Sequence, residues 1–172
     1  TLHYARQFIQ TWKGHELITP TIAPHAPYTC TDDILTKSRD LALEFDVPLH
    51  IHLSETAEEV KESYHLHNMA PLAYMNSLGL FQAKTIAAHC VHIEESEIYN
   101  IAELPVGVAH NPSSNLKLAS GFAPVVEMRN RHIPVGIGTD GTASNNDLDM
   151  FEEMRLTAFL PKGRSGDPTV LP

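Results

Sequence analysis

Short apolar runs that end in a histidine or an aspartate recur along this chain and constrain its fold more than any other feature. The runs close at His25 (ITPTIAPH), His52 (VPLHIH), His89 (TIAAH), His110 (PVGVAH) and Asp140 (PVGIGTD). Helix-like segments separate most successive runs, and such alternation is typical of a parallel sheet with right-handed crossovers. The carboxyl ends of parallel strands meet at one face, where (β/α) barrels carry their chemistry. The pattern predicts a metal-dependent barrel enzyme, or a large part of one.

The expected elements amount to about five βα units, whereas a closed (β/α)8 TIM-type barrel needs eight strands. Strands are expected over 17–23, 48–53, 85–90, 106–109 and 135–138. Helices are expected over 2–13, from the Thr31 cap to before Pro48, and over 56–65, 71–78, 94–102, 124–131 and 148–160, followed by a C-terminal loop. We therefore expect residues 1–172 to be an internal part of a longer α/β barrel.

Composition narrows the classes of partner and compartment. The formal charge of −9 argues against DNA or RNA as the main partner, and no apolar stretch is long enough to span a bilayer. The N-terminal TLHYARQF lacks the pattern of a signal peptide. The cysteines, Cys30 and Cys90, do not form a metal-type C-x-x-C pair, which indicates a reducing compartment. We expect a cytoplasmic protein with no nucleic-acid and no membrane partner.

The segment His52-Leu53-Ser54-Glu55 places a histidine at a strand end and a carboxylate just beyond it. The turn after the strand can swing Glu55 inward, and a metal ligand beside a carboxyl group suits metal-assisted hydrolysis, in which the carboxyl group moves protons. His50 shares a strand face with His52, because faces repeat every two residues. An H-x-H pair can chelate one metal, but we favour a position one layer lower for His50, where it packs or forms a hydrogen bond.

His89 ends the next strand, in position for a metal ligand or an acid–base group. We expect Cys90 to be a small buried apolar residue, and His92 to cap an element or face solvent. The segment from His110 to Asn115, HNPSSN, is either a turn held by its own polar side chains or part of a substrate site.

Asp140 ends the last strand run, within a segment rich in small residues, GIGTDGTASNND, that lets backbone approach a ligand closely. The G-x-G-x-x-G pattern that begins at Gly136 is not taken as a dinucleotide site. No helix is predicted to open at once, and an aspartate would point at the pyrophosphate.

These residues resemble the amidohydrolase superfamily. The resemblance rests on the segments PHAPYTC, HLSET, AAHCVH, VAHNPSSNLKLASG and GTDGTASNNDLDMFEEMR, which follow one another from about His25 to Arg155. The branch they resemble most is that of the 5′-methylthioadenosine/S-adenosylhomocysteine deaminases, whose relatives include guanine deaminases and triazine hydrolases. The resemblance implies a metal-bearing (β/α)8 barrel with a small flanking β-domain. Residues 1–172 would then be its central and C-terminal part, without the first strands and the flanking domain.

The resemblance also implies roles for individual residues. His52 and Asp140 would be metal ligands, completed by an H-x-H pair on a first strand that this sequence does not contain. Glu55 would be the proton shuttle to the purine ring nitrogen, His89 would orient the attacking water, and His25 would contact the purine or ribose. Glu55 and Asp140 would also contact substrate. The implied cofactor is one zinc ion, with iron or manganese as alternatives.

The implied reaction is hydrolytic deamination of an adenine nucleoside, such as 5′-methylthioadenosine, S-adenosylhomocysteine or adenosine, to its inosine analogue and ammonia. The implied partner is this small-molecule purine nucleoside, and a homo-oligomer stays open. Two alternatives also stay open. One is a related amidohydrolase acting on another amino- or chloro-heterocycle, such as guanine or a triazine. The other is a non-catalytic barrel fragment that lacks the N-terminal metal ligands.

Overall fold

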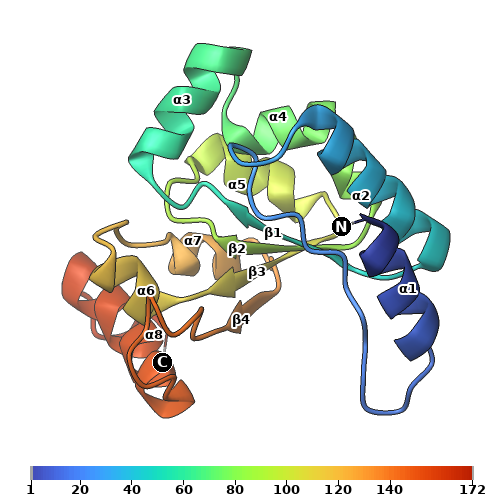
Figure 1. Cartoon of the computed structure of the whole chain (residues 1–172). Coiled ribbons are helices and arrows are strands. Elements are labelled where there is room, and N and C mark those ends of the chain that lie inside the picture. Colours follow the sequence, from blue (N-terminus) through green and yellow to red (C-terminus); the bar gives the residue numbers. More distant parts are fainter. Residues whose placement is uncertain (1, 172) are drawn as a thin grey trace.

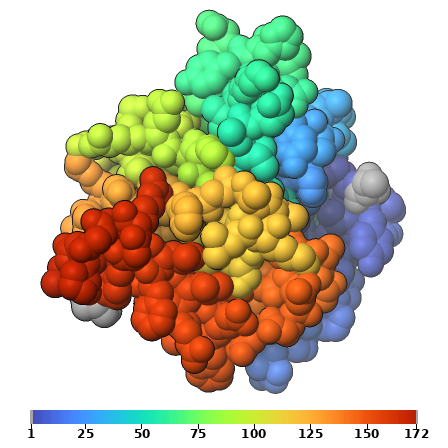
Figure 2. Space-filling model, turned by 90° about the vertical axis from the view of Figure 1, so that its left-hand side faces the viewer, coloured from blue at the N-terminus to red at the C-terminus, as the bar shows by residue number. Residues whose placement is uncertain are grey.

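Parallel strands in sequence order form the central sheet of the computed structural model, which describes residues 2–171 (Figure 1). The sheet has four strands in the order β1-β2-β3-β4, namely β1 (Leu49–Leu53), β2 (Thr85–His89), β3 (Val106–His110) and β4 (Val135–Ile137). The register pairs Leu53 with His89 and His110 with Ile137, so the carboxyl ends of the strands lie at one edge. This edge faces the left-hand side of Figure 1, and Figure 2 shows it directly.

Helices connect the strands, as the alternation predicted. They are α1 (Leu2–Trp12), α2 (Asp32–Phe45), α3 (Ala57–His67), α4 (Pro71–Ser77), the 3₁₀ turn η1 (Leu80–Gln82), α5 (Glu95–Ala102), α6 (Pro112–Lys117), α7 (Val125–Asn130) and α8 (Met150–Ser165). The Thr31 side chain accepts a hydrogen bond from the Ile34 N–H, and Thr56 does the same for Glu59, so both helix starts follow local capping signals. Within residues 2–171, no helix is long and apolar enough to cross a membrane.

The two faces of the sheet differ in burial. On β1, Leu49, Ile51 and Leu53 are buried, whereas His50 and His52 alternate with them on a half-buried face. The buried face belongs to one core that the helices cover. The other face corresponds to the interior of a barrel, which places His52 on the side where a barrel binds its ligands.

The expected first strand, 17–23, is wrong in extent. Only one parallel bridge forms there, between Ile22 and Leu49, with the Ile22 N–H donating to the Pro48 carbonyl over 2.9 Å. Pro20 and Pro24 flank this bridge and have no N–H to donate. A ladder therefore cannot extend far to either side of Ile22.

Two further boundaries differ from the prediction. Helix α8 continues past Leu160 through Pro161 to Ser165, and ends where Gly166, at φ +71°, donates its N–H to the Lys162 carbonyl. Only the end of the expected C-terminal loop is therefore non-helical. The HNPSSN segment is not a turn, because α6 starts within it, with Pro112 in its first turn where no helical N–H partner is needed.

Candidate metal centre

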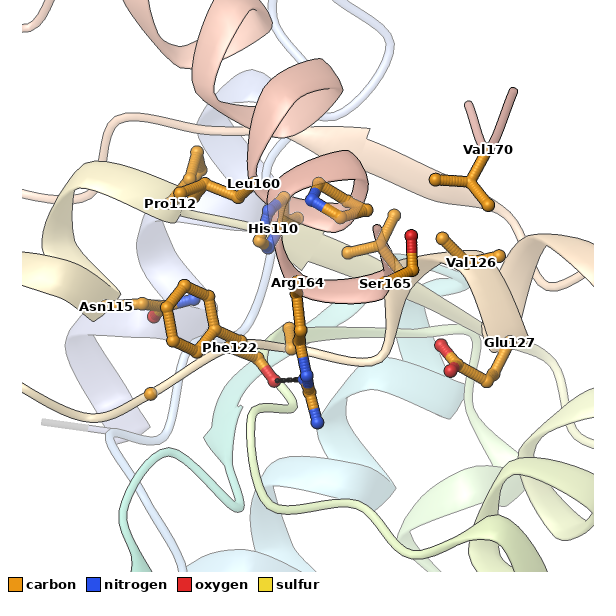
Figure 3. Close-up of a pocket in the computed structure, with 14 residues that line it drawn as sticks. His110, Pro112, Asn115, Phe122, Val126, Glu127, Leu160, Arg164, Ser165 and Val170 are labelled. Carbon is orange, nitrogen blue, oxygen red and sulfur yellow. Dashed lines mark hydrogen bonds between the residues drawn. The ribbon is translucent and has the colours of Figure 1, made fainter. Parts of the chain in front are cut away.

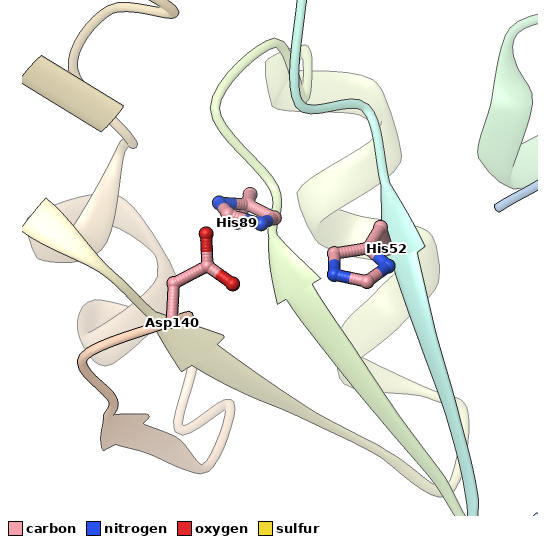
Figure 4. Close-up of side chains that lie close together, drawn as sticks. All are labelled: His52, His89 and Asp140. Carbon is pink, nitrogen blue, oxygen red and sulfur yellow. The ribbon is translucent and has the colours of Figure 1, made fainter. Parts of the chain in front are cut away.

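Three side chains gather at the carboxyl ends of the strands: His52, His89 and Asp140 (Figure 4). Each offers one ligand atom, and these atoms all lie within 4.8 Å of one another. His52 is on β1, His89 ends β2, and Asp140 follows β4 after a short loop. Imidazole nitrogen and carboxylate oxygen are the donors that zinc and related divalent ions accept in proteins.

Both histidines of this cluster have one ring nitrogen already occupied. The Nδ1 of His52 donates to the His25 carbonyl over 2.7 Å, and the Nδ1 of His89 donates to Asn115 Oδ1 over 2.9 Å. A proton on Nδ1 leaves the lone pair on Nε2, which is how metal-site histidines are commonly oriented. His89 is 1% exposed, and its φ of +71° departs from strand geometry at the end of β2.

Asp140 is held by two hydroxyl groups on one of its oxygens. Ser114 Oγ donates to Asp140 Oδ2 over 2.8 Å, and Ser144 Oγ donates to the same oxygen. Burial raises the pKa of Asp140, but these hydrogen bonds and the field of His89 outweigh it, so that the pKa lies below its ordinary value. The carboxylate is thus ionised at neutral pH, as a metal ligand must be.

Glu55 lies in the turn after β1, with its side chain 13% exposed and its Oε2 3.9 Å from His89 Nε2. Glu59, in the first turn of α3, holds this turn. Its carboxylate accepts the N–H of Ser54 over 2.9 Å and that of Glu55 over 2.7 Å. Burial raises the pKa of Glu59 despite these bonds. The turn does bring Glu55 inward, and the capping pattern of Thr56 and Glu59 was the signal that could have identified Glu59.

His25 and His50 lie beside the cluster without joining it. The His25 ring is exposed and its centre lies 4.9 Å from that of His52. Its Nδ1 forms a hydrogen bond with Thr29 Oγ1 over 2.8 Å. His50 is half-buried, and burial, with the neighbouring His52 and His89, lowers its pKa. It is not one of the three residues whose ligand atoms converge.

The residues next to the cluster agree with the sequence prediction only in part. His92 neither caps an element nor points freely to solvent, because it is partly buried and its Nε2 donates to the Ser120 carbonyl over 2.7 Å. Cys90 is fully buried, as expected. At Gly138, a Cβ would lie 2.5 Å from Asn111 Oδ1, so this glycine accommodates a neighbouring side chain.

The HNPSSN segment contributes to the site in a way that sequence reasoning missed. Ser114 and Asn115, both buried on α6, bind Asp140 and His89 respectively. Small polar residues directly after a strand end are the signal that could have suggested this. Neither proposed role, a self-contained turn or a substrate contact, describes these two bonds.

His110 ends an apolar run like the other histidines but lies in a different place. It lines a cavity of about 260 Å³ between α7 and α8, with Phe122, Val126, Leu160 and Arg164 among its walls (Figure 3). The Arg164 guanidinium donates to the Phe122 carbonyl over 3.0 Å at this cavity. His110 is 5% exposed, and its Nδ1 has no hydrogen-bond partner within residues 2–171.

The burial of His110 predicts an acid-sensitive contribution to stability. Burial, with a smaller effect of His89, lowers the pKa of His110 to about 4. As the pH falls from 7 to 4, an unfolded chain protonates this histidine near its ordinary pKa of about 6.5, whereas the folded chain resists. The free energy of unfolding is therefore greatest above about pH 6.5 and falls as the pH drops, by about 3 kcal/mol at pH 4. Denaturant unfolding of the full-length protein across this range should show His110→Gln losing less than the parent, while exposed His65→Gln follows the parent. Equal pH slopes for the parent and His110→Gln would contradict this.

Comparisons with known proteins show the family of this chain. Residues 2–171 match the amidohydrolase family. The chain belongs to the amidohydrolase family. It is 52% identical over 168 residues to a 5-methylthioadenosine/S-adenosylhomocysteine deaminase of Desulforudis audaxviator, covering 96% of this chain and 39% of that protein. It is 45% identical over 165 residues to a 5′-deoxyadenosine deaminase of Methanothrix thermoacetophila, covering 96% of this chain and 40% of that protein.

A solved amidohydrolase structure has the same fold over nearly the whole chain. An adenosine deaminase from Xanthomonas campestris with bound zinc superposes with a TM-score of 0.96 at 44% identity, covering 99% of this chain and 39% of that one. The predicted α/β barrel class is therefore confirmed, with this chain forming part of such a barrel. The amidohydrolase described here spans about two fifths of the length of these relatives.

Proposed function

We propose that the protein to which this chain belongs is a zinc-dependent deaminase of adenine nucleosides. It converts 5′-methylthioadenosine, S-adenosylhomocysteine or adenosine to the inosine analogue and ammonia. The observation that carries the proposal is the convergence of His52, His89 and Asp140 beside Glu55, in a chain that is 52% identical to a named deaminase of this kind. The chain supplies the central and C-terminal part of the barrel.

The residues present fit a divalent metal. The Nδ1 atoms of His52 and His89 are occupied, one oxygen of Asp140 is saturated by hydroxyl groups, and the remaining donor atoms converge. We propose His52 and Asp140 as ligands of a single zinc ion, together with an H-x-H pair upstream of this chain. The ion, when bound, supplies a water molecule acidic enough to act as a nucleophile at neutral pH.

The chain's own residues then carry the protons. Glu55, in its neutral form, protonates the purine ring nitrogen. As a carboxylate it then takes up the proton of the hydroxyl group added at C6 and passes it to the departing amine, so that ammonia leaves, and after turnover the proton taken from the attacking water returns to it. His89 hydrogen-bonds the attacking water and, with Asp140, directs it toward C6 and accepts its proton. The 3.9 Å between Glu55 Oε2 and His89 Nε2 leaves the two groups close enough to act on one reacting carbon.

The substrate contacts of this proposal come from Glu55, Asp140 and His25. The exposed His25 ring lies beside His52, with 4.9 Å between the ring centres and a tilt of 49° between their planes, and we propose that it contacts the purine or ribose. The cytoplasmic location, the lack of a nucleic-acid partner and any homo-oligomer remain predictions from composition and resemblance.

A substrate panel on the zinc-loaded, full-length protein tests the proposal. We expect deamination of 5′-methylthioadenosine or S-adenosylhomocysteine, followed as a fall in adenine absorbance with ammonia release. Chelation should abolish turnover, and zinc should restore it. Turnover of guanine or of a chlorotriazine in place of every adenine nucleoside would identify the alternative amidohydrolase activity. A metal-free, inactive full-length protein would identify a non-catalytic scaffold.

A further inference from the structure

Glu153 is a buried carboxylate that the proposed chemistry does not use. It lies in the first turn of α8 and is 1% exposed. Its Oε2 accepts the Ser113 N–H over 3.1 Å, and its Oε1 accepts Asn145 Nδ2 over 2.7 Å. Removing a carboxylate from water costs several kcal/mol unless hydrogen bonds replace the lost solvation. Both oxygens of Glu153 have such a bond, which indicates that its place in the fold is specific.

The two partners of Glu153 belong to the two segments that hold Asp140. Ser113 is next to Ser114 on α6, and Asn145 is next to Ser144 in the loop between β4 and α8. Ser114 and Ser144 both donate to Asp140 Oδ2. Figure 2 shows the segment near residue 115 (yellow) beside the C-terminal segments (orange and red) at this face. Glu153 thus connects α6 with the loop after β4, the two segments whose serine hydroxyl groups hold Asp140.

Asn145 extends this connection to the backbone next to Asp140. Its amide nitrogen donates not only to Glu153 but also to the Thr139 carbonyl, over 3.0 Å. Asp140 itself has φ +60°, in the left-handed region that costs energy for a residue with a side chain. A conformation of this kind persists only when the surrounding structure determines it. Asn145 supplies two of the surrounding hydrogen bonds, one to the Thr139 carbonyl and one to Glu153.

We propose that Glu153 is a positioning residue for the metal site: through Ser113 and Asn145 it holds Asp140 with Oδ2 bound to hydroxyl groups and the other oxygen directed to the ion. This inference rests on the proposed function only in taking Asp140 as a metal ligand. It predicts that metal affinity depends on a carboxylate that contacts neither the ion nor the substrate.

Glu153→Gln is the informative variant because it preserves size and burial. An amide places an N–H₂ group where one oxygen stood, opposite a group that is itself a donor, so one bond is lost and two donors face each other. We expect the zinc affinity of the full-length protein to fall by about 10- to 100-fold, the usual effect of losing a group that orients a metal ligand. Glu152→Gln is the matched control, because Glu152 is the preceding residue and is exposed.

The measurement is zinc affinity by competition with a chromogenic chelator, with the visible spectrum of the cobalt-substituted protein as a second readout. A positioning role predicts weaker binding and a changed cobalt spectrum in Glu153→Gln, at a metal-free melting temperature that still shows a folded protein. A purely structural role would lower the melting temperature and leave the affinity and spectrum of the folded protein as in Glu152→Gln, which would overturn the proposal. If the parent binds no divalent ion, the proposed function fails first, and the two failures are thereby distinguished.

Discussion

Glu55→Gln in the full-length protein is expected to retain its metal and lose most of its turnover. Glutamine preserves the size of the side chain and much of its hydrogen bonding, but it cannot carry a proton to the purine ring. General acid–base transfer is typically worth about 10²–10⁴ in rate, so kcat for 5′-methylthioadenosine should fall by at least that factor. The turn that carries Glu55 should remain in place, since Glu59 holds it through the backbone.

The control for this experiment is Glu58→Gln, an exposed glutamate one turn further along that pairs with Lys61. Glu58→Gln should match the parent in both turnover and metal content. Metal analysis and kcat are measured on the same preparations. A Glu55→Gln protein that keeps its metal and turns over within a few-fold of the parent would show that Glu55 is not the proton shuttle, and would make His89 the leading candidate.

The element pattern was predictable because its signals are local. Thr31 and Thr56 each cap the helix that follows them within three residues, and the strands are short apolar runs between helices. The failures have local causes as well. Pro20 and Pro24 limit the first strand to one bridge, and the stop signal for α8 is Gly166, beyond a proline that reads as a breaker.

The site was less predictable, because the histidines that end similar apolar runs lie on different faces of the sheet. His52 is the fourth residue of β1 and alternates with its buried leucines, whereas His110 is the fifth residue of β3 and shares the buried face with Val106 and Val108. A shift of one residue along the strand therefore separates a side chain at the candidate metal centre from one that lines the cavity between α7 and α8. His89 departs from the period altogether through its positive φ. No apolar pattern encodes these differences, and the proposed roles of His52 and Asp140 rest on the family resemblance.

A second limit of the sequence is that it does not reveal which glutamate side chains are buried. Glu153 bonds to Ser113 at a separation of 40 residues, and acidic residues in the first turn of a helix are ordinarily solvated. Only the folded arrangement of α6, α8 and the loop after β4 reveals that this carboxylate is enclosed. The groups that support the site are thus determined by tertiary contacts more than by the sequence near them.

His52→Ala is expected to remove most of the bound metal, and with it the activity. The His52 ring is already fixed by the bond from Nδ1 to the His25 carbonyl, so alanine deletes a preorganised donor. Loss of a group that merely orients a ligand already costs about 10- to 100-fold in affinity, and loss of the ligand itself should exceed that range. Zinc content after dialysis and chelator competition on the full-length protein measure the effect. His50→Ala, on the same strand and the same face two residues earlier, is the control and should keep its metal. Equal metal content in His52→Ala and the parent would remove His52 from the ligand set.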